Sequence, residues 1–366
     1  MGAMNELIDV DVIRCLVTEL ETAAPGQRLA KTSSITSSDL EPLNLRARSD
    51  LVEAALLNDL PDDYYAVAAI FRRALASPGF SGWSIWPVTE AVAALALSSD
   101  VQAAFDDGLS LLAELTPRLT SEFAIRRFLM ADLDRALESV MTWTAHPDAA
   151  VRRLASEGTR PFLPWAIRVR SILDTTACTV PILNALHEDE SDYVRRSVAN
   201  HLNDLSRQDP DLVVSLATEW LRDPGRHTRS VVRHGLRTLI KRAHPGALAL
   251  MGFSASALTV STPRLESKQV QAPGKLAFAF DVTNDGPEPA NIAVDYVIHF
   301  VKANGSLSDK VFKLAVRELA PGETTRFTKS HVFRPMTTRV HHAGTHALEV
   351  QVNGSRSGWT DFTLVL

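Results

Sequence analysis

The sequence is poor in cysteine and lacks the long apolar runs of membrane proteins. Cys15 and Cys178 are its 2 cysteines, and no Cys-x-x-Cys pair occurs, so the sequence encodes neither a disulfide scaffold nor a cysteine zinc site. No apolar run approaches the roughly 20 residues that cross a bilayer. The acidic start of the chain also lacks the basic and apolar regions of a secretory signal. We therefore expect a soluble cytoplasmic protein with reduced thiols and no membrane partner.

Most of the common catalytic motifs are missing as well. The sequence contains no G-x-G-x-x-G, Walker P-loop, G-x-S-x-G or H-E-x-x-H motif, which removes the usual support for nucleotide hydrolysis, serine hydrolysis and zinc proteolysis. His341, His342 and His346 lie close together in sequence, but no acidic residue or cysteine lies among them. We expect no metal site there and no cofactor.

The formal net charge of −5 hides an uneven distribution along the chain. Residues 1–100 carry 7 basic and 14 acidic groups, whereas residues 146–253 carry 15 and 12. The densest basic stretch is Arg222, Arg226, Arg229, Arg233, Arg237, Lys241 and Arg242, with Asp223 as the one acidic neighbour. The spacing of three or four residues predicts that most of them share one side of a helix. This side is either a solvated helix face or, as we favour, a phosphate-binding surface.

The first 250 residues predict one helix after another. Apolar residues recur there at three- and four-residue spacing, with short breaks at Pro, Gly and Ser. We expect helices near 46–58, 63–76, 87–98, 101–114 and 122–143, and the longest loop of this half at 25–38.

A short pattern repeats within these helices. Val-Arg pairs end the segments Asp148–Arg152, Ser191–Arg195 and Arg229–Arg233, at intervals of 43 and 38 positions in the sequence. This interval is close to the two-helix unit of HEAT and armadillo arrays, in which each helix pair buries its apolar face against its neighbours. We therefore predict an α-solenoid, with Arg152, Arg195 and Arg233 directed toward one shared ligand.

After Phe253 the periodicity changes from helical to alternating. Segments such as Lys275–Val282, Ala293–Phe300, Arg326–Phe333 and His346–Val352 have period two. Hairpin signals separate them, at Asn284-Asp-Gly286, Asn304-Gly305, Ala320-Pro-Gly322 and Asn353-Gly354. The pattern predicts an immunoglobulin-like β-sandwich without a disulfide. The predicted domains are therefore an all-α HEAT-like unit, 1–253, and an all-β sandwich, 258–366.

The run from His146 to Trp165 holds the most informative residues. Glu157 is followed by Gly158 and two prolines, so the helix that begins near Asp148 must end just beyond it. Trp165 would then be presented on a turn fixed by proline, or would anchor the core between repeats. Glu157 would stand near a helix terminus, or would form an ion pair with a neighbouring arginine at i−4 or i+3.

Three motifs in this order resemble the AlkC branch of the HEAT-like alkylpurine DNA glycosylases. They are the run 146–165, the run 192–204 with the sequence DYVRRSVANHLND, and the run 233–241 with the sequence RHGLRTLIK. The resemblance is densest over about residues 120–253, and some members of this branch carry a C-terminal immunoglobulin-like domain. Phe162 departs from the pattern, because a basic residue is expected there.

The resemblance implies excision of alkylated bases, chiefly 3-methyladenine, from double-stranded DNA without flipping of the nucleotide into a deep pocket. An N-alkylated purine is already cationic and leaves readily, so such an enzyme needs anions more than a strong acid. Carboxylates near the deoxyribose would stabilise the oxocarbenium-like transition state and orient the attacking water.

The resemblance also implies roles for individual residues. Glu157 and Asp204 are the preferred electrostatic and water-positioning residues. Glu122 is a third candidate; alternatively it is a helix-dipole partner in a first turn. Trp165 would pack against the lesion nucleotide. The candidate phosphate contacts, some of which could instead be ion pairs between repeats, are Arg152, Arg160, Arg195, Arg229, Arg233, Arg237 and Lys241.

Two questions stay open at the level of sequence. The β-sandwich could clamp DNA, which we favour, or recruit a protein partner. The whole chain could also be a non-catalytic HEAT scaffold that binds protein or nucleic acid. Carboxylates gathered within a basic face would indicate the glycosylase, and a purely basic or apolar groove would indicate the scaffold.

Overall fold

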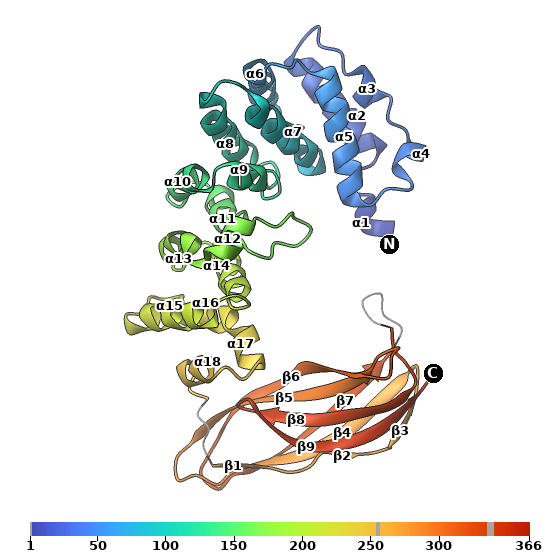
Figure 1. Ribbon diagram of the computed structural model, residues 1–366, viewed down its shortest axis with the longest axis vertical. Coiled ribbons are helices and arrows are strands. Elements are labelled where there is room, and N and C mark those ends of the chain that lie inside the picture. Colours follow the sequence, from blue (N-terminus) through green and yellow to red (C-terminus); the bar gives the residue numbers. More distant parts are fainter. Residues whose placement is uncertain (1, 254–256, 335–339) are drawn as a thin grey trace. The chain divides into compact units, whose positions relative to one another are not determined.

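The computed structural model describes residues 2–253, 257–334 and 340–366, which form helices followed by a β-sandwich (Figure 1). The chain divides into two compact units. We call Met1–Val213 with Trp220–Gly235 the helical unit, and Val214–Glu219 with Leu236–Leu366 the second unit. None of the described helices is long and apolar enough to cross a membrane.

The helices follow one another with short connections. In chain order they are α1 Gly2–Asn5, α2 Val10–Ala23, α3 Ala30–Ser33, α4 Ser37–Leu40, α5 Leu45–Asp59, α6 Tyr64–Ala74, η1 Gly82–Ser84, α7 Ile85–Ser98, α8 Ala103–Leu115, α9 Ile125–Ala131, α10 Leu133–Trp143, α11 Ala149–Glu157, α12 Arg170–Asp174, η2 Thr176–Thr179, α13 Val180–Leu186, α14 Asp192–Leu205, α15 Pro210–Arg222, α16 Thr228–Gly235, α17 Arg237–Lys241 and α18 Pro245–Leu250. The order of packing follows the order of the chain, as a solenoid requires.

The repeated Val-Arg pattern places three helices side by side. Helices α11, α14 and α16 carry it, and α14 packs against both of the others. Val151, Val194 and Val232 are wholly buried between them. The close approach of α16 needs a glycine, because a Cβ on Gly235 would stand 2.5 Å from the side chain of Leu202. The HEAT-like repeat prediction is confirmed.

Most helix predictions hold, and the exceptions have local causes. The predicted helix 122–143 is two helices, because Asp132 interrupts it and accepts a hydrogen bond from the backbone of Arg135 as the N-cap of α10. The predicted loop 25–38 contains α3 and the start of α4. Here the Asp59 carboxylate accepts hydrogen bonds from the backbone of Lys31 and Thr32, so a residue distant in sequence caps α3.

The basic stretch 222–245 does not lie on one helix, so this prediction is wrong. It extends from the end of α15 through α16 and α17 to the start of α18. Arg229 and Arg233 are exposed on α16, whereas Arg237 is half-buried and Lys241 is exposed on α17. The division between the two units falls between Gly235 and Leu236. The three- to four-residue spacing of the basic residues continues through the turns between these helices, so the spacing alone could not reveal the turns.

Two antiparallel-rich sheets form the sandwich (Figure 1). The strands are β1 Leu258–Val260, β2 Arg264–Leu265, β3 Gln269–Gln271, β4 Gly274–Asn284, β5 Ala290–Val301, β6 Leu307–Leu319, β7 Thr324–Phe333, β8 Gly344–Val352 and β9 Ser355–Val365. In one sheet β4 pairs with β1 and β2 on one side and with β7 on the other; the second sheet has the order β3-β9-β8-β5-β6. The four predicted strands lie within β4, β5, β7 and β8, and the immunoglobulin-like prediction is confirmed.

Three of the four predicted hairpin signals adopt a left-handed backbone. Gly305 (φ 78°), Gly322 (φ 72°) and the Asn353-Gly354 pair (φ 44° and 82°) all have positive φ. Gly286 does not; its amide donates instead to the side chain of Asn284. This Asx-turn satisfies the backbone without the left-handed region.

The boundary between the predicted domains stays a prediction. It falls at residues 254–257, of which 254–256 lie outside the described residues. Leu248 and Phe253 pack against Ala293 of β5, which places the last helix in the second unit together with the sandwich.

Candidate active site

Three carboxylates from three segments of the helical unit lie within one ion-pair network. Glu122 is in the turn before α9, Glu157 is the last residue of α11, and Asp204 is near the end of α14. Their exposed fractions are only 9%, 6% and 2%. Buried carboxylates are costly unless they are paired, so their partners decide what the cluster can do.

Arg160 joins two of the carboxylates. Its Nη1 donates to Glu157 Oε1 at 2.6 Å, and its Nε donates to Asp204 Oδ2 at 2.9 Å. Burial alone would lower the pKa of Arg160, but the two anions raise it above its ordinary value. Ser197 of α14 donates a further hydrogen bond of 2.6 Å to Glu157 Oε2. The end of α11 is thereby held against α14.

Arg153 connects the third carboxylate to the other two. It forms an ion pair with Glu122 and lies 3.4 Å from Glu157 Oε1 through Nη2. Thr120 also donates to Glu122 Oε2 at 2.9 Å. The alternative placement of Glu122 in the first turn of a helix is wrong, because α9 begins only at Ile125. Both ion pairs considered for Glu157, with Arg153 and with Arg160, are present.

The loop 158–169 after α11 is fixed by a buried arginine on α9. The guanidinium of Arg126 is fully enclosed and donates to the carbonyl oxygens of Gly158 (3.0 Å), Arg160 (2.9 Å) and Ile167 (2.6 Å). Burial, together with the cations of Arg168 and Arg160, lowers the pKa of Arg126 to about 10. Arg126 therefore positions the backbone of Arg160, whose side chain binds Glu157 and Asp204.

Two aromatic side chains are exposed on the segments that carry this cluster, the loop 158–169 and α14. Trp165 has a positive φ of 61° on the loop 158–169, and 59% of it is exposed, which excludes the alternative of a core anchor. Tyr193 of α14 is 45% exposed and packs under the guanidinium of Arg153, 5.0 Å from the ring centroid. Burial and the charges of Glu122 and Glu157 raise the pKa of the Tyr193 hydroxyl.

Phe162 stands where a basic residue was expected, and its ring forms cation–π contacts with two arginines. The guanidinium groups of Arg168 and Arg207 lie 5.1 and 4.9 Å from its ring centroid. Both arginines are exposed, and Arg207 lies in the turn after α14, three residues beyond Asp204. A cation–π arrangement of this kind holds two positive charges over one aromatic ring of the loop 158–169.

The repeated arginines have structural contacts within the solenoid. Arg152 donates to the carbonyls of residues 146 and 147, and Arg195 donates to those of residues 189 and 190, the same offsets of six and five residues. Arg152 also pairs with Asp189 at 2.7 Å, across two repeats. Each arginine thus fixes the turn before its own helix. Arg152 adopts the alternative of an ion pair between repeats, and contact of Arg195 with DNA stays a prediction.

Tyr193, Arg126, Arg153 and Ser197 were not predicted as site residues. The i, i+4 spacing of Arg153 and Glu157 was the one signal available for them. The contacts of the other three depend on packing between repeats. The carboxylates lie among cations rather than in a purely basic or apolar groove, which is the arrangement expected of the glycosylase.

Comparisons with known proteins identify the family of the chain. Residues 119–239 match the family described as DNA alkylation repair enzyme, and residues 259–366 match the C-terminal Ig-like domain of protein YhaZ. The chain is 32% identical to Bacillus subtilis YhaZ over 364 residues, 99% of each chain. It is also similar to the structure of Pseudomonas fluorescens alkylpurine DNA glycosylase AlkC bound to DNA containing an abasic site analog, with a TM-score of 0.90, 31% identity and 100% coverage of both chains.

The match extends over both parts of the architecture, the helical repeats and the β-sandwich, and the DNA alkylation repair match includes all three carboxylates. The chain therefore belongs to the DNA alkylation repair enzymes, in the AlkC branch of the alkylpurine DNA glycosylases that carries a C-terminal immunoglobulin-like domain.

Proposed function

We propose that this protein excises cationic N-alkylated bases, chiefly 3-methyladenine, from double-stranded DNA by hydrolysing the N-glycosidic bond, as a step of base excision repair. The observation that carries the proposal is the cluster of Glu122, Glu157 and Asp204, joined by Arg153 and Arg160, with Trp165 exposed on the loop that follows Glu157. The structural relative AlkC was solved with DNA containing an abasic site analog, and an abasic site is what base excision leaves behind.

The chemistry needs negative charge that is already in place. As a cationic base departs, positive charge moves onto the deoxyribose, and fixed carboxylates stabilise that charge without reorganisation. Charge-assisted hydrogen bonds from Arg160 and Ser197 hold Glu157 in one orientation. In a site with little water these interactions are stronger than in bulk solvent. We assign Glu157 and Asp204 to stabilisation of the sugar cation and to orientation of the attacking water.

Trp165 supports recognition at the surface rather than in a deep pocket. Its ring is exposed on a loop that Arg126 holds at both ends. An exposed indole face can contact a deoxyribose or a cationic base through stacking and cation–π attraction. We therefore propose that the lesion is processed without flipping into an enclosed cavity.

Release of 3-methyladenine from methylated duplex DNA tests the proposal. The Glu157→Gln variant should lose roughly 100-fold or more of the single-turnover rate, as for loss of one preorganised electrostatic group. Glu138→Gln, an exposed carboxylate on α10, is the matched control and should retain full activity. Full activity of Glu157→Gln would remove this residue from the mechanism, and absence of base release by the wild-type protein would refute the proposed function.

A further inference from the structure

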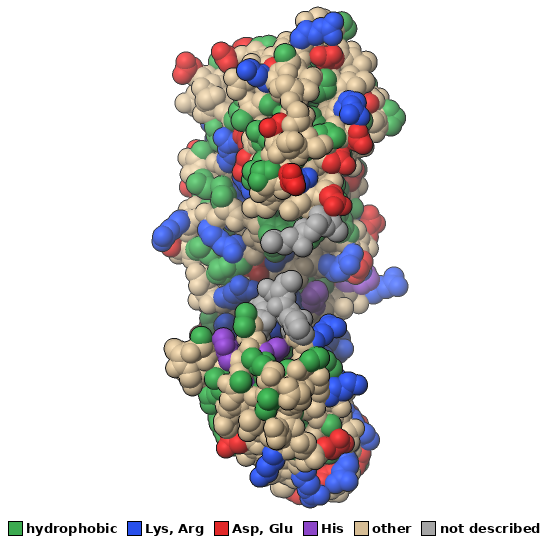
Figure 2. Space-filling model, turned by 90° about the vertical axis from the view of Figure 1, so that its right-hand side faces the viewer, with side chains coloured by type: hydrophobic (Ala, Val, Ile, Leu, Met, Phe, Trp, Pro, Cys, Tyr) green, Lys and Arg blue, Asp and Glu red, His purple; other side chains and the backbone are tan. Residues whose placement is uncertain are grey.

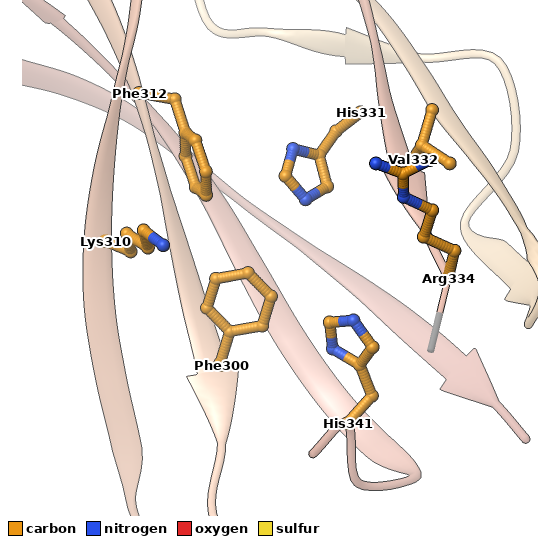
Figure 3. Close-up of a pocket in the computed structure, with 7 residues that line it drawn as sticks. All are labelled: Phe300, Lys310, Phe312, His331, Val332, Arg334 and His341. Carbon is orange, nitrogen blue, oxygen red and sulfur yellow. The ribbon is translucent and has the colours of Figure 1, made fainter. Parts of the chain in front are cut away.

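The β-sandwich contains a pocket at one open side of its core. Strand β6 is the outer strand of one sheet, and β7 is at the edge of the other, where its pairing partner is β4. The two strands are joined by the turn at 320–323, and the pocket lies toward their opposite ends. Its volume is about 360 Å³, within the range of small-ligand sites. Its described lining is Phe300, Lys310, Phe312, His331, Val332, Arg334 and His341 (Figure 3).

Aromatic and imidazole rings form the wall of this pocket. His331 meets Phe312 edge to face at 4.7 Å between centroids, and His341 stacks on Phe300 at 5.9 Å. The rings are held from behind, since the Tyr296 hydroxyl forms a hydrogen bond of 3.0 Å with His331 Nδ1. Planar rings in fixed positions present faces and edges to which another planar group can be added.

The charged groups of the pocket are all cationic among its described lining residues. Lys310 of β6 and Arg334, which follows β7, are exposed and lie on opposite sides of the ring group (Figure 3). Lys310 also lies over the Phe312 ring, with Nζ 5.4 Å from its centroid. On the face shown in Figure 2, histidine and hydrophobic side chains of this domain lie together at the surface, with Lys and Arg side chains around them.

We propose that this pocket binds one unpaired nucleotide within a single strand of DNA. A ring wall with cations beside it is the arrangement by which proteins hold single strands, with bases stacked on aromatic groups and phosphates on Lys or Arg. A nucleotide inside a strand has a phosphate on both sides of its base. Lys310 and Arg334, on either side of the rings, match two phosphates better than the single phosphate of a free mononucleotide.

The choice of DNA as the polymer rests on the proposed function, because the DNA alkylation repair match identifies the nucleic acid that the chain meets. The pocket itself is made of residues outside that match, which ends at residue 239. The inference therefore adds a second, non-catalytic nucleic-acid site to the chain. It also favours DNA over a protein partner as the ligand of the sandwich.

Fluorescence anisotropy of the full-length protein with a labelled single strand of about ten nucleotides tests this site. Lys310→Glu and Arg334→Glu should each weaken binding about tenfold. Each should also reduce the slope of log affinity against log salt by the amount that about one phosphate contact contributes. Phe312→Leu, which keeps an apolar side chain but removes the ring, should weaken binding about tenfold through lost stacking. Lys268→Glu, an exposed lysine outside the pocket lining, is the charge-matched control and should bind as the wild type does.

A strand that contains 5-iodouracil locates the contact, and ultraviolet light should attach it to the peptide that carries Phe312 or His331. Unchanged affinity in both charge variants, or cross-links elsewhere alone, would overturn the inference. So would competition by thymidine monophosphate or polyglutamate as strong as that of the unlabelled strand. Glu157→Gln separates the two proposals, because it should lose base release while keeping single-strand affinity. Base release with wild-type affinity in the pocket variants refutes only the pocket.

Discussion

Arg126 is the residue on which the geometry of the loop 158–169 depends. Its guanidinium satisfies three carbonyl oxygens between Gly158 and Ile167. A lysine would keep the charge but present a point donor instead of a planar fork, so at least one buried carbonyl would lose its partner, at a cost of about 1–3 kcal/mol. We expect Arg126→Lys to lower the single-turnover rate of base release about tenfold, with a smaller change in affinity for duplex DNA.

Arg127→Lys is the matched control for this variant. It lies on the same helix, but its guanidinium is partly exposed and pairs with Glu53, outside the carboxylate cluster. A purely structural role of Arg126 would lower thermal stability and leave the rate per folded molecule unchanged. The single-turnover rate per folded molecule therefore distinguishes the two roles. It falls if Arg126 positions the loop, and it stays unchanged if Arg126 only stabilises the fold.

Tyr193 offers a second test at the level of single residues. Its ring is partly exposed and covers Arg153, which pairs with Glu122. Tyr193→Phe keeps the ring and should retain most of the activity. Tyr193→Leu removes the cation–π contact, worth about 0.5–1 kcal/mol at such sites, and should lower the single-turnover rate several-fold. Equal activity of the two variants would show that the ring has no part in holding Arg153.

The candidate carboxylates could be predicted from sequence, whereas their supports could not. Glu157 and Asp204 lie inside runs that resemble a known family, and Gly158 correctly marked the end of α11. The partners of Arg126 are backbone carbonyls, which have no signature in the sequence. No sequence pattern marks Tyr193 either, because the exposure of its ring depends on where the neighbouring repeats end.

At the level of elements, His201 connects three of them. It lies on α14, is fully buried, and contacts the Ser156 carbonyl of α11 at 2.9 Å and the Thr179 hydroxyl of η2 at 3.1 Å. Burial and the nearby cations of Arg160 and Arg126 lower the pKa of His201 to about 3. A protonated imidazole would add a third positive charge to this interior.

Acid should therefore destabilise the helical unit through His201. Above pH 6.5 the imidazole is neutral in both the folded and the unfolded chain. Between pH 6.5 and the folded value of about 3, the unfolded chain binds a proton that the folded chain does not. The free energy of unfolding then decreases by up to about 1.4 kcal/mol for each pH unit of acidification. Urea unfolding followed by tryptophan fluorescence at several pH values measures this slope.

His201→Asn gives the reference for that measurement, because asparagine can still donate to the Ser156 carbonyl but does not titrate. The difference in unfolding free energy between wild type and variant should shrink as the pH falls below 6.5. Parallel pH profiles of the two proteins would contradict the assignment. Carboxylates elsewhere in the chain contribute equally to both proteins and cancel in the comparison.

Periodicity predicted elements better where burial is one-sided than where caps intervene. Burial alternates along β4 and β7, so the period-two pattern of these strands follows the two faces of a sheet. The helix predicted over 122–143 failed at Asp132, whose capping carboxylate looks in sequence like any polar helix residue. The basic stretch 222–245 failed for the same reason, since turns near 223–227 and 236 preserve a helical spacing of charges.

At the level of the whole molecule, the net charge of −5 contrasts with binding to a polyanion. Acidic groups are concentrated in the first hundred residues, where several pair with arginine, as Asp50 does with Arg46. Exposed arginines of α16, Arg229 and Arg233, belong instead to the basic stretch. Affinity for DNA therefore depends on local charge, and the total charge is a poor guide to it.

Salt dependence of duplex binding separates DNA-contacting arginines from structural ones. We expect affinity to fall steeply between about 50 and 200 mM salt, through release of counterions. The double variant Arg229→Gln/Arg233→Gln should reduce the slope of log affinity against log salt by about 2, since each phosphate contact contributes about 0.9. Arg152→Gln should leave this slope unchanged and lower stability by about 3 kcal/mol instead, because it breaks a buried ion pair with Asp189.

Arg14→Gln/Arg28→Gln removes the same charge from the acidic part of the chain, where both side chains are exposed, and should keep the wild-type slope. A reduced slope in this control would mean that overall charge, rather than the surface of α16, governs binding. A wild-type slope in the α16 double variant would show that Arg229 and Arg233 belong to a solvated surface and do not bind phosphate. A reduced slope in Arg152→Gln would mean that DNA binding opens the ion pair with Asp189, so that this arginine serves the turn and the phosphate in succession.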